Sequence, residues 1–146
     1  MAETLCKFQL YSGVIMTNGP KQVILVRRDL RMKRASIAAL VAKASAEFFL
    51  DNDESSRGDK LSVNLTPQES EWISSGSTRI VLGVPSESAL KTLAFKAEVA
   101  GLQCYQITGG APDKFDADFG PETLVVAIGP DESDKIDEIT GNLKLF

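Results

Sequence analysis

Short apolar runs, separated by polar and glycine-rich stretches, dominate the pattern of this chain. Four such runs are rich in β-branched and other apolar side chains and are bounded by turn residues, which is typical of strands. They lie at residues 22–26, 78–84, 102–107 and 123–128. The last run, Thr-Leu-Val-Val-Ala-Ile, is the most apolar, so we expect the central strand of a sheet there.

Between the strand runs, apolar positions recur with the period of an α-helix. Ile37, Val41, Ala44 and Phe48 lie on one narrow stripe and predict a core-facing helix that begins near Ala35. Two more helices are predicted, one from Pro85-Ser86 to a stop at Gly101 and one from Asp131 to Thr140, with Gly141 after it.

A fourth, shorter helix has the clearest start signal. Residues 51–64 are polar and rich in Ser and Asp, which indicates a solvated loop. Thr66-Pro67 then places a capping residue before a proline, and Glu69 follows the cap by three positions. This spacing predicts a capping box and a helix through Trp72. Trp72 is expected in the core rather than as a platform for a nucleic-acid base.

The order of these elements predicts one α/β domain. We expect a four-stranded, mainly parallel (mixed) sheet with helices on both faces. Residues 21–146 form the domain, and residues 143–146 are its extended tail. Residues 1–20 are a leader, for which a disordered arm and an extra edge strand both remain open.

A dense group of cations follows the first strand. Five of the 16 Lys and Arg residues fall within eight positions: Arg27, Arg28, Arg31, Lys33 and Arg34. Cations at a helix start oppose the helix dipole, whereas an anion bound among them removes the conflict. Ligands of α/β sheets also gather beyond the carboxyl ends of strands. The pattern therefore favours an anion site over a basic loop that is only solvated.

Composition narrows the chemistry. The chain has no histidine, which excludes Ser-His-Asp and Cys-His catalysis and His-ligated zinc. Cys6 and Cys104 are far apart, as expected of free thiols in a reducing cytoplasm. No metal or cofactor is expected, and no apolar run is long enough to span a membrane. The net charge of −4 argues against general affinity for polyanions, so any such binding must be local.

Several segments carry a family resemblance. They read V-I-L-V-R-R-D-L-R-M, G-V-P-S-E-S-A-L-K-T-L and the closing A-I-G-P-D-E-S-D-K-I-D-E-I-T-G-N-L-K-L-F. Through them, residues 21–146 resemble the archaeal and eukaryotic (type 2) peptidyl-tRNA hydrolases. The resemblance implies that family's fold, a cytoplasmic role in translation, and tRNA or another phosphate-bearing ligand as partner. It leaves a homodimer open.

The chain departs from the family pattern at its site. Through the first helix the family reads approximately D-L-x-M-x-K-G-K-x-A-A-Q-x-x-H-A. Here Arg34, Ser36, Leu40 and Lys43 stand at the two lysines, the glutamine and the histidine. The family's D-A-G-x-T after the third strand has its acid and hydroxyl replaced by Gly109 and Asp113. Ser36 and Lys43 are seven residues apart, about 10 Å along a helix, which is too far for a nucleophile–base pair.

Two functional interpretations follow. The first is a catalytically degenerate family member that retains an anion site, formed by Arg27, Arg31, Lys33, Arg34 and Lys43. The alternative is an active esterase acting on peptidyl-tRNA or a related N-blocked aminoacyl ester without histidine or metal. Its candidate catalytic residues are Asp29, Arg34, Ser36 and Asp113.

Overall fold

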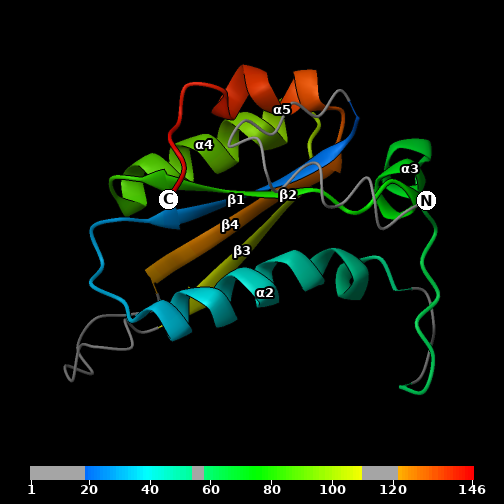
Figure 1. Ribbon diagram of the computed structural model, residues 1–146, viewed down its shortest axis with the longest axis horizontal. Coiled ribbons are helices and arrows are strands. Elements are labelled where there is room, and N and C mark those ends of the chain that lie inside the picture. Colours follow the sequence, from blue (N-terminus) through cyan, green and yellow to red (C-terminus); the bar gives the residue numbers. More distant parts are fainter. Residues whose placement is uncertain (1–18, 54–57, 110–121) are drawn as a thin grey trace.

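The computed structural model describes residues 19–53, 58–109 and 122–146. These residues form four strands and four helices (Figure 1). In chain order the elements are β1 (Lys21–Arg27), α2 (Arg34–Asp51), α3 (Pro67–Ser74), β2 (Arg79–Val84), α4 (Glu87–Val99), β3 (Cys104–Gly109), β4 (Glu122–Asp131) and α5 (Ser133–Thr140). Most of the expected leader lies outside the described residues.

The sheet is mixed, with strand order β2-β1-β4-β3. β1 pairs with β2 in parallel, while β4 is antiparallel to both β1 and β3. β1, β2 and β3 therefore run in the same direction, and β4 runs against them. The predicted mixed sheet is confirmed. The predicted central position of β4 is confirmed, since eight of its ten residues are buried.

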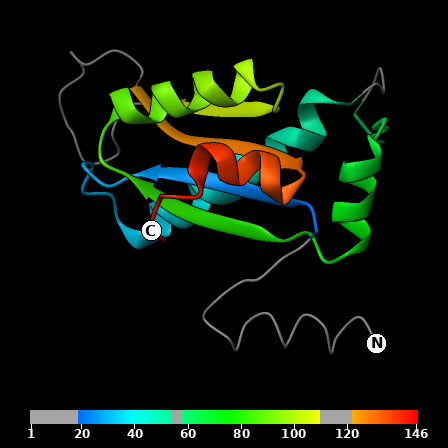
Figure 2. The same ribbon diagram turned by 90° about the horizontal axis from the view of Figure 1, so that it is seen from above.

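Helices cover both faces of the sheet, as the sequence predicts. α2 lies on one face, and α4 and α5 lie on the other (Figures 1 and 2). The side chains of β1 alternate between the two cores, as the period of a strand requires. Val23 and Leu25 pack under α4 and α5. Ile24 and Val26 pack with Phe48 of α2 and with Trp72 of α3.

The capping box predicted at Thr66 is confirmed. The Glu69 N–H donates to Thr66 Oγ1 at 3.2 Å, and the Thr66 N–H donates to Glu69 Oε2 at 2.8 Å. Pro67 occupies the first turn, where its missing N–H leaves no helical bond unmade. These contacts fix where α3 begins.

Thr66→Ala is expected to lower the free energy of unfolding by about 1 kcal/mol, because one N–H of the first turn loses its acceptor. Urea denaturation followed by circular dichroism measures the change. Thr66→Ser keeps the hydroxyl and serves as the control. Equal loss in both variants would contradict the capping role.

β4 continues past residue 128, where the sequence pattern predicted its end. Gly129 has a φ of +87°, which residues with a side chain rarely adopt. Its N–H donates to the Gln103 carbonyl, and the register with β1 shifts between the Val23↔Ile128 and Lys21↔Asp131 pairs. The irregularity allows pairing to resume, so β4 ends at Asp131 and α5 begins at Ser133.

The predicted extended tail runs along the outer edge of β2. Leu145 bridges Leu82, the Gly83 N–H donates to the Lys144 carbonyl, and the Phe146 N–H donates to the Val81 carbonyl. The tail thus takes up backbone groups that an edge strand would otherwise leave unpaired.

Candidate functional site

The strand register brings the termini of all four described strands together at one end of the sheet. Arg27 at the end of β1 pairs with Val84 at the end of β2. Gly109 at the end of β3 pairs with Glu122 at the start of β4. The carboxyl ends of three strands, the start of β4 and the loop that leads to α2 therefore meet there. This is the end of the sheet where the sequence predicted a ligand.

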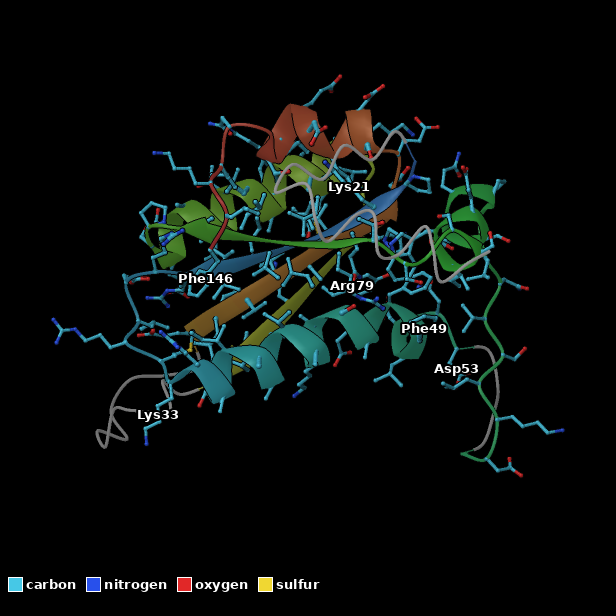
Figure 3. All side chains as sticks on the ribbon, in the orientation of Figure 1. Lys21, Lys33, Phe49, Asp53, Arg79 and Phe146 are labelled. Carbon is cyan, nitrogen blue, oxygen red and sulfur yellow. The ribbon has the colours of Figure 1, made fainter. Side chains whose placement is uncertain are left out.

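Three cations, Arg31, Lys33 and Arg34, form what we call the cationic patch. All three are exposed, and Lys33 extends from the end of the molecule at the start of α2 (Figure 3). Lys33 is the N-cap residue of α2. Within the described residues, neither a side-chain cap nor an acidic residue in the first turn balances this helix start. The N–H groups at this helix start and the patch carry charge of the same sign.

Arg27 is placed differently from the other cations. Its side chain is only 7% exposed, and its guanidinium pairs with two carboxylates. Nε and Nη2 donate to the two oxygens of Asp29 at 3.0 and 2.6 Å, and Nη1 donates to Glu122 at 2.9 Å. The hydrogen bonds to Asp29 raise the pKa of Arg27, burial opposes them, and Glu122 adds to the rise. These contacts remove Arg27 from the cations that we assign to a ligand.

Glu87 at the start of α4 extends this group of charges. Its Oε1 accepts from the Thr123 N–H at 3.1 Å and from Lys91 Nζ at 2.8 Å. The Lys91 contact, followed by the Thr123 N–H, lowers the pKa of Glu87. The Thr123 carbonyl in turn accepts from Arg27 at 3.3 Å. We call Arg27, Asp29, Glu122 and Glu87 the Arg27 cluster.

Sequence reasoning missed Glu122 and Glu87. Glu122 is 95 residues from Arg27 and follows a stretch of sequence with no regular apolar pattern, so spacing gave no indication of the contact. One signal was present, because an arginine that continues an apolar strand run needs carboxylate partners when it is buried. Arg27 directly follows the run Val-Ile-Leu-Val.

The remaining predicted site residues lie along α2 or outside the described residues. Ser36 is partly buried near the helix start, and Lys43 is exposed two turns later. Leu40 packs against the apolar core that contains Phe48 and Trp72. Asp113 lies outside the described residues. Ser36 and Lys43 thus occupy the same helix without forming the close pair that nucleophilic activation needs.

The described residues offer neither a metal site nor a membrane-spanning helix. In the described residues, no three Cys, Asp or Glu side chains are grouped so that they could hold a metal ion. None of the helices in these residues is both long and apolar enough to cross a membrane. Cys104 is a free thiol, and burial raises its pKa to about 12. It is therefore a poor nucleophile at neutral pH.

Comparison with known proteins assigns the architecture to a family. The family model described as Peptidyl-tRNA hydrolase PTH2 matches residues 20–146, which include every described helix and strand. The chain belongs to this family. The peptidyl-tRNA hydrolase resemblance noted in the sequence is thereby confirmed.

Individual peptidyl-tRNA hydrolases show the same extent of similarity. The chain is 36% identical over 127 residues to a peptidyl-tRNA hydrolase of Methanocaldococcus jannaschii, covering 86% of this chain and 99% of that protein. Those of Haloquadratum walsbyi and Methanothermobacter thermautotrophicus are 35% and 34% identical, with the same two coverages. The similarity thus covers the whole domain and almost the whole of each relative.

Proposed function

We propose that this chain is a peptidyl-tRNA hydrolase family member that binds the phosphate backbone of tRNA without hydrolysing its ester. Arg31, Lys33, Arg34 and Lys43 are the proposed contacts. The observation that carries the proposal is the cationic patch at the start of α2, a helix start that no side chain of the described residues caps. We further propose a cytoplasmic location, in keeping with the peptidyl-tRNA hydrolases among its relatives.

Electrostatics support local rather than general binding. The whole chain carries a net charge of −4, so nucleic acid is repelled from most of its surface. The patch concentrates positive charge at the first turn of α2, whose N–H groups have no side-chain cap from the part of the chain that the structure describes. Phosphate oxygens accept hydrogen bonds from both kinds of donor. The surface is therefore suited to a few phosphates.

The side chains at the family's site positions support the loss of hydrolysis. Arg34 stands where the family pattern has a lysine, and a guanidinium stays protonated and cannot act as a base. Leu40 packs against the core and offers no donor to orient water or a carbonyl. Loss of one such donor typically lowers the rate by about 10²–10³. Asp29 already accepts two hydrogen bonds from Arg27, which hinders its use as a general base.

Hydrolysis of peptidyl-tRNA or a related N-blocked aminoacyl ester is the second candidate function. The names of the relatives favour it, since proteins 34–36% identical over the same span are peptidyl-tRNA hydrolases. In this case Asp29, Arg34, Ser36 and Asp113 form a rearranged catalytic set. Asp113 would supply the acid that Gly109 lacks.

Binding and turnover of N-acetyl-aminoacyl-tRNA separate the two functions. We expect saturable binding that weakens with salt, and no ester cleavage above the uncatalysed rate at high protein concentration. One relative, the Methanocaldococcus jannaschii enzyme, is the positive control for the substrate. Turnover that disappears in Asp113→Ala would establish the hydrolase and refute the degenerate interpretation. Absence of binding would refute both.

A further inference from the structure

We infer that Arg27 is a positioning residue of the anion site, because it fixes the loop that presents the cationic patch. This inference rests on the proposed function, which supplies tRNA as the ligand. It assigns a role to a buried arginine that does not itself contact RNA. Arg27 ends β1, and the patch begins four residues later at Arg31.

The contacts of Arg27 connect the loop to the opposite side of the site. One edge of the guanidinium donates two hydrogen bonds to Asp29, which lies in the loop itself. Nη1 donates to Glu122 and to the Thr123 carbonyl, both at the start of β4. Paired hydrogen bonds of this kind fix orientation as well as distance. The loop is therefore held to β4 through one side chain.

Arg28 holds the same loop from the other side of the sheet. Its N–H donates to the Val84 carbonyl, and its side chain donates to the Leu145 carbonyl and stacks on the Phe146 ring. A Cβ at residue 83 would lie 2.0 Å from Arg28 Nε, so the glycine leaves the path open. These contacts fix the chain immediately before Asp29. Arg27 holds the next part of the loop through its hydrogen bonds to Asp29.

Charge makes the position of Arg27 matter for an anion. The side chains of Asp29 and Glu122 are 37% and 20% exposed, so both carboxylates lie near the surface that RNA would approach. Arg27 offsets part of their negative charge. Without Arg27 that offset is lost, and the two carboxylates repel an approaching phosphate more strongly. Loss of an arginine with a purely structural role elsewhere in the fold does not change the repulsion of phosphate at this site.

Arg27→Met is expected to weaken tRNA binding by about tenfold, because Arg27 and the patch are coupled through the loop that joins them. It should also accelerate amide hydrogen exchange over residues 28–36 in the protein without RNA. Arg79→Met is the matched control. Arg79 is an exposed arginine on β2 whose side chain donates to Ser45 Oγ and stacks on Trp72. It lies well away from Lys33 (Figure 3).

In Asp29→Ala, an effect of net charge and an effect of positioning change RNA affinity in opposite directions. Removing a carboxylate beside the patch should tighten RNA binding if only net charge matters. If Arg27 acts by holding Asp29, binding should weaken by about threefold instead, with faster exchange over residues 28–36. Arg27 keeps its contact with Glu122 in this variant, which favours folding.

The outcomes distinguish this inference from the proposed function. Weaker binding in Arg27→Met and Asp29→Ala, with unchanged binding in Arg79→Met, supports it. Tighter RNA binding by Asp29→Ala overturns it. An equal loss of RNA affinity in Arg27→Met and Arg79→Met, explained by the fraction of each variant that is unfolded, also overturns it. If the wild-type chain binds no tRNA, the proposed function fails. The exchange rates over residues 28–36 then still decide whether Arg27 holds the loop, and unchanged rates overturn the inference.

Discussion

Arg31→Ala combined with Arg34→Ala is expected to weaken tRNA binding by at least about tenfold near physiological salt. Each lost phosphate contact should also reduce the slope of log affinity against log salt by about 1, so the double variant loses about 2. Both side chains are exposed at the start of α2, where they can reach phosphates without rearrangement. Titration of labelled tRNA at several salt concentrations measures both quantities.

A control must remove the same charge from another surface. Lys96→Ala with Lys135→Ala neutralises two exposed lysines on α4 and α5. If binding depends on the cationic patch, this variant should keep most of the affinity and nearly the full salt slope. Equal losses in the two double variants would show that only net charge matters, and that result would refute the site.

Stability provides an independent check, because the expected sign is opposite. A cation at a helix start is unfavourable by about 0.3–1 kcal/mol, so Arg34→Ala should stabilise the RNA-free protein slightly. Weaker binding by a more stable protein excludes unfolding as the cause. The patch is then a feature that lowers stability and is compensated when an anion binds.

Local signals were sufficient for most of the fold. Thr66 and Glu69 predicted the start of α3 because a capping box involves only neighbouring residues. The apolar stripe that includes Ala44 and Phe48 predicted the buried side of α2. The sequence did not indicate which strand is reversed, because the antiparallel placement of β4 depends on pairing with β1 and β3. Local periodicity carries no information on that pairing.

The candidate site was predicted only in part, for a similar reason. The cations after β1 are adjacent in sequence, so their clustering was visible at once. Their different environments were not visible. Arg27 points inward to Glu122, while Arg31 remains exposed, and only the approach of β4 to β1 produces this division. In the sequence alone, Arg27 and Arg31 are two equivalent positive charges.

Trp72→Ala is expected to lower the free energy of unfolding by about 3–5 kcal/mol. The side chain is fully buried, its ring meets Phe48 edge-on with centroids 6.0 Å apart, and Nε1 donates to the Thr78 carbonyl at 2.8 Å. A domain of this size is stable by only about 5–15 kcal/mol. Thermal unfolding followed by circular dichroism should show a midpoint lower by about 10–15 °C.

Trp72→Phe separates packing from the hydrogen bond of the indole. It keeps much of the aromatic contact with Phe48 and should cost about 1–2 kcal/mol, since the Thr78 carbonyl still accepts from the Gln22 N–H. RNA affinity of the folded protein should not change in either variant, because α3 lies at the opposite end of the molecule from Lys33 (Figures 1 and 3). If Trp72→Phe weakens RNA binding while the protein stays folded, Trp72 contributes to recognition. Its assignment as a core residue alone would then be wrong.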